Sequence, residues 1–535
     1  MQVLLTHSMA KVTPDWQPTA PLEGLTGWEG QTLSFQVAWL APPTGRETPS
    51  SEVRVEVDGA ADVATFDVGL VPVHVPCWRE HDDAYIATEP GLLPDLLRPT
   101  DGPARATHLG WHSIWVDVTL PASELVITVT DRGDEVARLV LPVTTVPAPV
   151  EAPDLEVTQW FHADCLGTYY GVETWSEEHW EAIGRQMRSA ARMGSTMLLT
   201  PVWTPPLDTE RCANRPRTQL LDIELVDGRY SFGHDRLDRW MELAAAAGLS
   251  QVEVPHLFTQ WGATAAPQVW VRVEGEERQL FGWHTDALDP EYQNFLGQVV
   301  PFLIDYFGGR VGLGNTIFHV SDEPTDEHLA SYGASAASVA PLLEGCRVVD
   351  ALSHPEFADL VQVPVVATDA VGAFRDAGIE PGWVYHCIAK SWGVANRFIA
   401  QEGIRTRALG WQLYKAGAVG FLHWGFNFYN AQLSRRPIDP FHDTSAGGGF
   451  IGGDPFVVYP GPGYEPLESQ RHRLFAEAMG DLAAAQRAER LIGRDAVLGI
   501  VDPEGNLDYA AWWVTAEEWL RRRDALDRAA AAALG

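Results

Sequence analysis

The segment 315–324 reads NTIFHVSDEP, an apolar run that ends abruptly in two adjacent acids, Asp322 and Glu323. A short run of apolar and β-branched residues bounded by polar ones predicts a buried strand. Removing a carboxyl group from water costs free energy, so acids at the end of a buried strand are candidates for function. The same dipeptide at 134–135 and 326–327 lies in polar, turn-like sequence. We therefore expect acid–base chemistry at 322–323.

On both sides of this segment, strand-like stretches alternate with helical ones. The predicted strands are 155–160, 196–201, 251–256, 316–320, 347–352, 363–368, 383–387 and 420–424. Amphipathic helical patterns lie between several of them, at 176–193, 235–247 and 404–416. This rhythm predicts an α/β fold of the (β/α)8 TIM-barrel type. A doubly wound sheet is the alternative, although no Gly-x-Gly-x-x-Gly follows a strand.

The two ends of the chain have other patterns. Alternating runs at 51–57, 71–75, 114–118 and 125–129 predict an N-terminal β-sandwich domain over residues 1–150. The Pro- and acid-rich stretch 146–153 predicts a linker, followed by the barrel domain over 154–464. Residues 465–535 predict helices that pack on the barrel, the last one preceded by Thr515 and Glu518 in a capping-box pattern.

Composition narrows the classes of partner. The 535 residues carry a net charge of -34, which argues against nucleic acid or an anionic membrane as a partner. Five cysteines without zinc-type spacing predict neither a disulfide framework nor a structural metal. We see no signal-peptide pattern and no window approaching the roughly 18 apolar residues of a membrane span. The expectation is a cytoplasmic protein without a cofactor.

In a (β/α)8 barrel, the functional residues lie at the carboxyl ends of the strands. The predicted ends carry aromatic, His and Asn side chains, which suit a carbohydrate substrate whose ring faces stack and whose hydroxyls form hydrogen bonds. The candidates for substrate contact are His162, Trp203, His256, Trp261, Tyr385, Trp424 and Asn427. The pattern leaves the oligomeric state open.

A metal centre is not expected. His162 and Asp164 are spaced like two ligands, but no third ligand is evident and His-Glu-x-x-His is absent. Asp350 and Asp369 also fall near the ends of predicted strands, and we expect them to cap loops or support the site.

A glycosidase usually needs two carboxyl groups, one as acid and one as nucleophile or base. The ends of the seventh and eighth predicted strands carry no acid. Adjacent carboxyl groups suit a different solution, in which the 2-acetamido group of the substrate is the nucleophile. Glu323 would protonate the leaving oxygen, and Asp322 would orient the acetamido group. Two neighbouring acids also separate each other's pKa values, which keeps one protonated.

Three other interpretations remain open. The acids could be a structural pair in which Asp322 caps the following turn. The protein could cleave another sugar with Glu323 and a different carboxylate, such as Asp164 or Asp369. It could also be a carbohydrate-binding protein without catalytic activity.

Several segments together resemble a known family. They are WFH at 160–162, YYGVE at 169–173, LTPVWTPP at 199–206, HLFTQWG at 256–262, HVSDEP at 319–324, GFLHWG at 420–425 and GDPFVVYP at 453–460. Over about residues 70–490 the chain is similar to the DUF4091 proteins and to the catalytic domain of glycoside hydrolase family 123. The resemblance implies an N-terminal β-sandwich, a barrel and exo-acting β-N-acetylgalactosaminidase chemistry through an oxazoline intermediate. It also implies that Asp322 and Glu323 carry catalysis and that Tyr385 steadies the acetamido oxygen.

Overall fold

The central sheet contains all eight strands predicted for the barrel. The computed structural model describes residues 1–41, 51–511 and 514–535. The strands, all parallel, are β11 (Glu156–Gln159), β12 (Met197–Leu198), β15 (Val252–Glu253), β18 (Thr316–Phe318), β19 (Arg347–Leu352), β20 (Val363–Ala367), β21 (Trp383–Tyr385) and β22 (Gly420–His423). Their order is β12-β11-β22-β21-β20-β19-β18-β15. At the seam, β12 and β15 share only an isolated bridge between Leu199 and Glu253, so the barrel is nearly closed.

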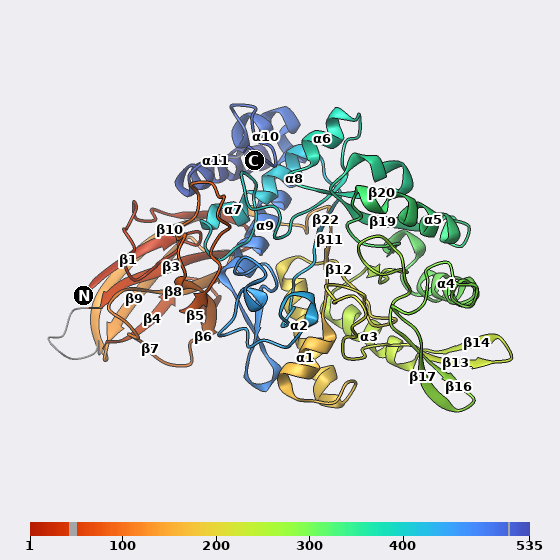
Figure 1. Ribbon diagram of the computed structural model, residues 1–535. Helices are drawn as coiled ribbons and strands as arrows, with labels where there is room; N and C mark the ends of the chain where they lie inside the picture. The colour runs from red at the N-terminus through yellow and green to blue at the C-terminus, as the bar shows by residue number, and fades with distance from the viewer. Residues whose placement is uncertain (42–50, 512–513) are drawn as a thin grey trace.

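Helices surround this sheet (Figure 1). They are α1 (Ala163–Tyr170), α2 (Glu177–Met193), α3 (Asp235–Ala247), α4 (Pro290–Arg310), α5 (Leu329–Val339), α6 (Val371–Asp376), α7 (Gly403–Arg407) and α8 (Leu409–Ala416). The helix predicted at 176–193 begins where Ser176 Oγ accepts a hydrogen bond from the His179 N–H and ends at the left-handed Gly194. The single helix predicted at 404–416 is two helices, α7 and α8, joined at Ala408.

The rhythm of strand and helix is interrupted in places. A separate four-stranded sheet, of order β14-β13-β16-β17, was not predicted and projects from the side of the barrel (Figure 1). Its strands are β13 (Asp222–Val226), β14 (Arg229–Gly233), β16 (Val269–Val273) and β17 (Glu276–Phe281). Only a 3-10 helix, η3 (Pro355–Leu360), connects β19 to β20. Further 3-10 turns are η1 (Leu313–Asn315), η2 (Asp326–His328), η4 (Gln432–Ser434), η5 (Ala446–Gly448) and η6 (Pro462–Tyr464).

The N-terminal region forms two five-stranded sheets. One has the order β1-β3-β8-β5-β6 and the other β2-β10-β9-β4-β7. Their bounds are β1 (Gln2–His7), β2 (Leu25–Glu29), β3 (Thr32–Ala41), β4 (Glu52–Asp58), β5 (Asp62–Val73), β6 (Gly91–Pro99), β7 (Ala104–Arg105), β8 (Gly110–Thr119), β9 (Glu124–Asp131) and β10 (Asp134–Pro149). Buried side chains from both sheets, such as Phe35 and Ile127, belong to one hydrophobic cluster.

The predicted linker is shorter than expected. Strand β10 runs to Pro149, so the first residues of the stretch 146–153 are paired with β2. The pairing is irregular between Val146 and Pro149, which is where a sheet tolerates proline.

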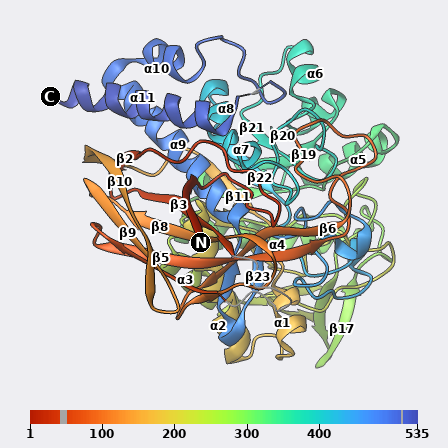
Figure 2. The ribbon, with the colours of Figure 1, turned by 90° about the vertical axis from the view of Figure 1, so that its left-hand side faces the viewer.

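The C-terminal region is helical, as predicted. After the short strands β23 (Val458–Pro460) and β24 (Pro466–Glu468) come α9 (Gln470–Ile492), α10 (Arg494–Val501) and α11 (Ala516–Leu534). Helix α9 packs on α7 and α8, whereas α11 also lies against β2 and β10 of the N-terminal sheets (Figure 2). Helix α11 therefore contacts both the N-terminal sheets and the other C-terminal helices. In the described part of the chain, no helix is long and apolar enough to cross a membrane.

Candidate active site

A pocket of about 190 Å³ lies at the carboxyl ends of the barrel strands. Five of the predicted site residues line it. They are Asp322 and Glu323 after β18, Tyr385 at the end of β21, Trp424 after β22 and Trp261 after β15. Segments far apart in the sequence thus bring two acids and three aromatic side chains to one cavity.

The backbone that carries the two acids is held from both sides. The Asp350 carboxylate accepts hydrogen bonds from the backbone N–H groups of Val320, at 3.0 Å, and Ser321, at 3.3 Å. On the other side, the Trp261 N–H donates to the Asp322 carbonyl oxygen at 3.1 Å. Asp350 is therefore a loop-capping group, as the sequence suggested, and the position of the acids is fixed through the main chain.

Strained backbone gathers around the pocket. Four lining residues other than glycine have positive φ angles: Asp208 at 36°, Trp261 at 56°, Glu323 at 38° and Leu433 at 61°. Such conformations cost about 1–3 kcal/mol each and persist where the surrounding structure enforces them, often at ligand sites. The strain indicates that these side chains are held in specified directions.

Glu323 belongs to a chain of polar contacts. The Tyr385 hydroxyl donates a hydrogen bond to Glu323 Oε1. That hydroxyl lies 3.0 Å from Ser353 Oγ, to which Lys390 Nζ donates at 3.5 Å. Lys390 is in turn 3.3 Å from the carboxylate of Asp369. Asp369 is thus an ion-pair partner outside the pocket lining.

Asp322 is the more buried acid of the pair. Burial, followed by repulsion from Glu323, raises the pKa of Asp322 well above its usual value. Among the described residues, none donates a hydrogen bond to its carboxyl oxygens. Asp322 therefore presents a carboxyl group that is poorly solvated and ready for a donor from a ligand.

A buried ionic network lies beneath the pair. His319 Nε2 is 2.6 Å from Glu253 Oε1, and His319 Nδ1 is 3.3 Å from Asp350 Oδ1. Burial opposes protonation of His319, but hydrogen bonds to Asp350 and Glu253 raise its pKa to about 9. The imidazolium at neutral pH joins the ends of β15, β18 and β19 and places a positive charge behind Asp322.

Two groups of side chains in the described ranges resemble metal ligands in spacing. The ligand atoms of His256, His319 and Asp350 lie within 4.8 Å of one another, as do those of the surface residues Asp326, His354 and Glu356. In the buried group, both nitrogens of His319 already face carboxylates. That group is therefore better described as the ionic network above.

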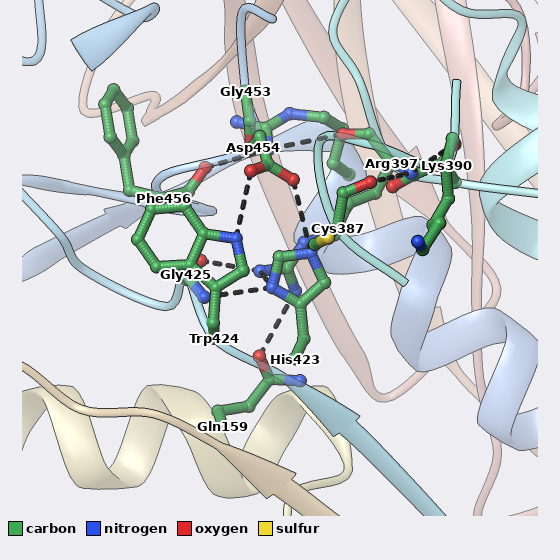
Figure 3. Close-up of polar contacts among 12 residues, drawn as sticks. Gln159, Cys387, Lys390, Arg397, His423, Trp424, Gly425, Gly453, Asp454 and Phe456 are labelled. Atoms are coloured by element: carbon green, nitrogen blue, oxygen red, sulfur yellow. Dashed lines mark hydrogen bonds and ion pairs between the residues drawn. The ribbon is translucent and has the colours of Figure 1, made fainter. Parts of the chain in front are cut away.

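The pocket wall at Trp424 rests on a second buried network, shown in Figure 3. Trp424 Nε1 donates to Asp454 Oδ2 at 2.9 Å, and His423 Nε2 lies 3.8 Å from Asp454 Oδ1 (Figure 3). Arg397 donates to His423 Nδ1 at 2.6 Å. Burial raises the pKa of Asp454 to about 7, although Arg397 opposes this shift. The indole is thus oriented by a fully buried acid.

Four predicted substrate contacts do not line the pocket. Trp203 is buried in the core and donates to the His256 carbonyl at 3.1 Å. The centroids of the His256 and His319 rings lie 4.4 Å apart with the rings tilted by 31°, and no described residue forms a hydrogen bond with either ring nitrogen of His256. Asn427 Oδ1 accepts a hydrogen bond from the His162 N–H at 2.8 Å. Proximity to a strand end does not decide whether a side chain points into the cavity or into the wall.

His162 and Asp164, the pair with metal-like spacing, are held by an arginine. Arg215 donates to both oxygens of the Asp164 carboxylate, at 2.6 and 3.0 Å, and lies 3.1 Å from His162 Nδ1. A cation already occupies the position that a metal would need. Asp164, like Asp369, lies outside the pocket lining.

Several lining residues were missed by the sequence reasoning, among them Asp208, Gln260, Leu433 and Phe450. Asp208 and Leu433 come from long loops after β12 and β22, where no periodic pattern indicates direction. Gln260 lies four residues beyond the predicted strand 251–256. The sequence carried no signal that would have separated these residues from their neighbours.

The chain matches the family model described as glycoside hydrolase 123, catalytic domain, over residues 160–487. No curated protein matches the chain. Among solved structures, a family 123 glycoside hydrolase from Clostridium perfringens, studied for glycolipid glycan hydrolysis, aligns at a TM-score of 0.71 with 12% identity, covering 99% of this chain and 97% of that one. A family 39 glycoside hydrolase from Bacteroides cellulosilyticus aligns at 0.36 with 9% identity, covering 88% and 82%.

The alignment with the Clostridium protein covers 99% of this chain, and the family model matches more than half of this chain. The protein belongs to glycoside hydrolase family 123.

Proposed function

We propose that the protein is an exo-acting, retaining glycosidase that removes a terminal β-linked 2-acetamido sugar, GalNAc-like, by substrate assistance. The observation that carries this proposal is that Asp322 and Glu323, adjacent in sequence, both line one small pocket. A volume of about 190 Å³ is below that of most sites for drug-sized ligands, which favours a single terminal sugar.

The proposed architecture follows the same reasoning. The nearly closed sheet acts as a (β/α)8 barrel over residues 154–464. Residues 1–150 form a β-sandwich domain, and 465–535 a helical segment that ties the two together. The pocket at the strand ends is where such barrels carry their chemistry.

In the first step, Asp322 accepts a hydrogen bond from the acetamido N–H, and the acetamido carbonyl oxygen attacks the anomeric carbon. Glu323 gives its proton to the glycosidic oxygen as the bond from that oxygen to the anomeric carbon breaks, and Asp322 takes the acetamido N–H proton, which leaves a neutral oxazoline. In the second step, Glu323 takes a proton from water and the water oxygen attacks the anomeric carbon. Asp322 returns its proton to the nitrogen as the ring opens, with net retention. Trp424 and Trp261 offer ring faces for the sugar.

The protonation of the pair is consistent with these roles. In the free protein, burial and Glu323 raise the pKa of Asp322, so the pair retains a proton. An acetamido N–H would supply the hydrogen bond that Asp322 lacks, and this favours its ionised form. In the proposed mechanism, the general-acid role then falls to Glu323.

The experiment compares nitrophenyl β-GalNAc, β-GlcNAc and β-galactoside as substrates, each with and without a thiazoline that mimics the oxazoline. The proposal predicts cleavage of a 2-acetamido substrate and strong inhibition by the thiazoline. Cleavage of the plain galactoside, insensitive to thiazoline, would instead support a glycosidase of another specificity with a different second carboxylate. Binding of sugars without turnover would support a carbohydrate-binding protein.

A further inference from the structure

A third acid, Asp208, lines the same pocket as the catalytic pair. It comes from the loop that follows β12, and its main chain is fixed at both ends. Its N–H donates to Gln260 Oε1 at 2.6 Å, and its carbonyl oxygen accepts from Ser434 Oγ at 2.7 Å. These bonds place the side chain independently of any ligand.

The Asp208 carboxylate is only half used by the protein. Oδ2 accepts a hydrogen bond from the Leu433 N–H at 2.9 Å, which joins the loops after β12 and β22. Within the described ranges, Oδ1 accepts no hydrogen bond. All three residues at this junction have positive φ, 36° at Asp208, 61° at Leu433 and 52° at Ser434. The stability of the two loops alone does not explain why this strained contact leaves Asp208 Oδ1 without a hydrogen bond.

Among the residues that the structure describes, no unpaired cation faces Asp208. The two arginines that act on it, Arg215 and Arg435, are already paired with Asp164 and Glu210. Burial raises the pKa of Asp208 to about 6, so this carboxylate is mostly ionised at neutral pH. Its negative charge also helps to raise the pKa of Asp322. Holding a third acid here is costly, and the proposed hydrolysis does not use it.

We infer that Asp208 is a specificity-determining residue whose Oδ1 accepts a hydrogen bond from a ring hydroxyl of the terminal sugar, at carbon 3, 4 or 6. This inference rests on the proposed function, in which Glu323 and Asp322 serve the groups on carbons 1 and 2. The remaining hydroxyls are donors, and a carboxylate is the acceptor that binds them most strongly. A site built to accept such a hydrogen bond rejects sugars that lack the hydroxyl.

The test combines variants with deoxy substrates. Asp208→Asn retains an oxygen for the Leu433 N–H but loses the charge, and Asp208→Ala loses both. Glu210→Gln is the matched control, because Glu210 holds the same two loops together through Arg435 at 3.0 Å and lies outside the pocket lining. The kcat/KM of each variant is measured on the preferred nitrophenyl glycoside and on its 3-deoxy, 4-deoxy and 6-deoxy analogues, with Tm recorded alongside.

We expect Asp208→Asn and Asp208→Ala to lose about 10- to 100-fold in kcat/KM on the parent substrate, the size of a hydrogen bond to a charged group. On the one deoxy analogue that lacks the bound hydroxyl, the kcat/KM values of the two Asp208 variants and of the wild type should be nearly equal. On every substrate, the kcat/KM of Glu210→Gln should match that of the wild type. Equal losses on the parent and on all three analogues would overturn the inference and leave a structural role. If the wild type cleaves only glycosides without a 2-acetamido group, the proposed function fails, and the same comparison on their deoxy analogues still decides the role of Asp208. If the wild type cleaves neither class of glycoside, the proposed function and the role of Asp208 are both overturned.

Discussion

Glu323 has an oxygen held by the Tyr385 hydroxyl, which leaves its other oxygen for the glycosidic bond. A general acid matters most when the leaving group is poor, because a good leaving group departs without a proton. Glu323→Gln should therefore lose about 100-fold or more in kcat/KM on an alkyl or sugar aglycone and far less on a dinitrophenyl one. Steady-state kinetics on the two substrates measure this, and equal losses would remove the acid role from Glu323.

The Tyr385 hydroxyl itself can be tested separately. Tyr385→Phe removes the donor to Glu323 while keeping the ring in the wall, and we expect kcat/KM to fall by about 10- to 100-fold with little change in Tm. Ser353→Ala, one contact further away at 3.0 Å, should cost less. Full activity of Tyr385→Phe would show that the hydroxyl neither orients Glu323 nor contacts substrate.

The sequence predicted which residues lie near the carboxyl ends of the strands, but not which of their side chains point into the pocket. Asp322, Glu323, Trp261, Tyr385 and Trp424 reach the pocket. His256 and Asn427, also near strand ends, do not line the pocket: the His256 ring packs beside that of His319, and Asn427 accepts a hydrogen bond from the His162 N–H. Asp208 reaches the pocket from a loop whose course depends on contacts with a segment more than 200 residues away.

Among the secondary-structure elements, β15, β18 and β19 are joined beneath the pocket by His319. The pKa of His319 is raised from 6.5 to about 9, so its ionic contribution to stability is fully present below pH 6.5 and is lost as pH rises through about 9. His319→Gln leaves Glu253 and Asp350 buried without their cation and should lower the free energy of unfolding by about 3–5 kcal/mol at pH 6.

Urea unfolding at pH 6 and at pH 10 measures this difference between His319→Gln and the wild type. The difference should narrow at the higher pH, because the wild type has then lost the same ion pairs. The control is His234→Gln, a half-exposed histidine 2.8 Å from Asp238, for which we expect about 0–1 kcal/mol. A destabilisation that is equal at both pH values would contradict the protonated state of His319.

The elements themselves were largely predictable. Short strand-like stretches predicted all eight barrel strands, and Ser176 and Gly194 marked the ends of α2. The four-stranded sheet β14-β13-β16-β17 was missed, although Asp227-Gly228 and Glu274-Gly275 sit at its two hairpin turns with positive φ. Those strands are short and half-exposed, so their apolar pattern is weak beside the buried strands on each side.

For the whole molecule, a fully buried ion pair between Arg471 and Asp95 helps to connect the N-terminal sheets to the C-terminal helices. Arg471 on α9 donates to both oxygens of Asp95 on β6, each at 2.9 Å. The same guanidinium donates to the carbonyl oxygens of Gly453 and Phe456, which flank the Asp454 that orients Trp424. Stability of the pocket wall therefore depends on residues at both ends of the chain.

Asp95→Ala leaves Arg471 buried without its counter-charge and should cost about 3–5 kcal/mol of unfolding free energy. Because Arg471 also holds the Asp454 loop, activity at a temperature well below Tm should fall as well. Chemical denaturation and kinetics measure the two effects, with the exposed Asp101→Ala as the control. Unchanged stability of Asp95→Ala would show that the two regions are coupled by other contacts.

The contacts between the three regions of the chain were the least predictable feature. Two changes of pattern along the sequence predicted the three regions, whereas the contacts of α11 with β2 and β10 had no signal in the sequence. These regions meet through long-range contacts, such as Trp28 Nε1 to Asp527 at 2.8 Å and the Trp411–Trp519 stack at 3.8 Å. No local pattern in the sequence encodes partners separated by 499 residues.

In the proposed mechanism, the substrate supplies the nucleophile while Asp322 and Glu323 assist it. This is tested by measuring kcat/KM for a series of nitrophenyl 2-acetamido glycosides whose acetyl group carries zero, one, two or three fluorine atoms. Each fluorine weakens the carbonyl oxygen as a nucleophile, so we expect kcat/KM to fall steeply, by about 100-fold or more across the series. A flat response across the series would contradict it, because an enzyme nucleophile does not depend on the basicity of the acetamido carbonyl.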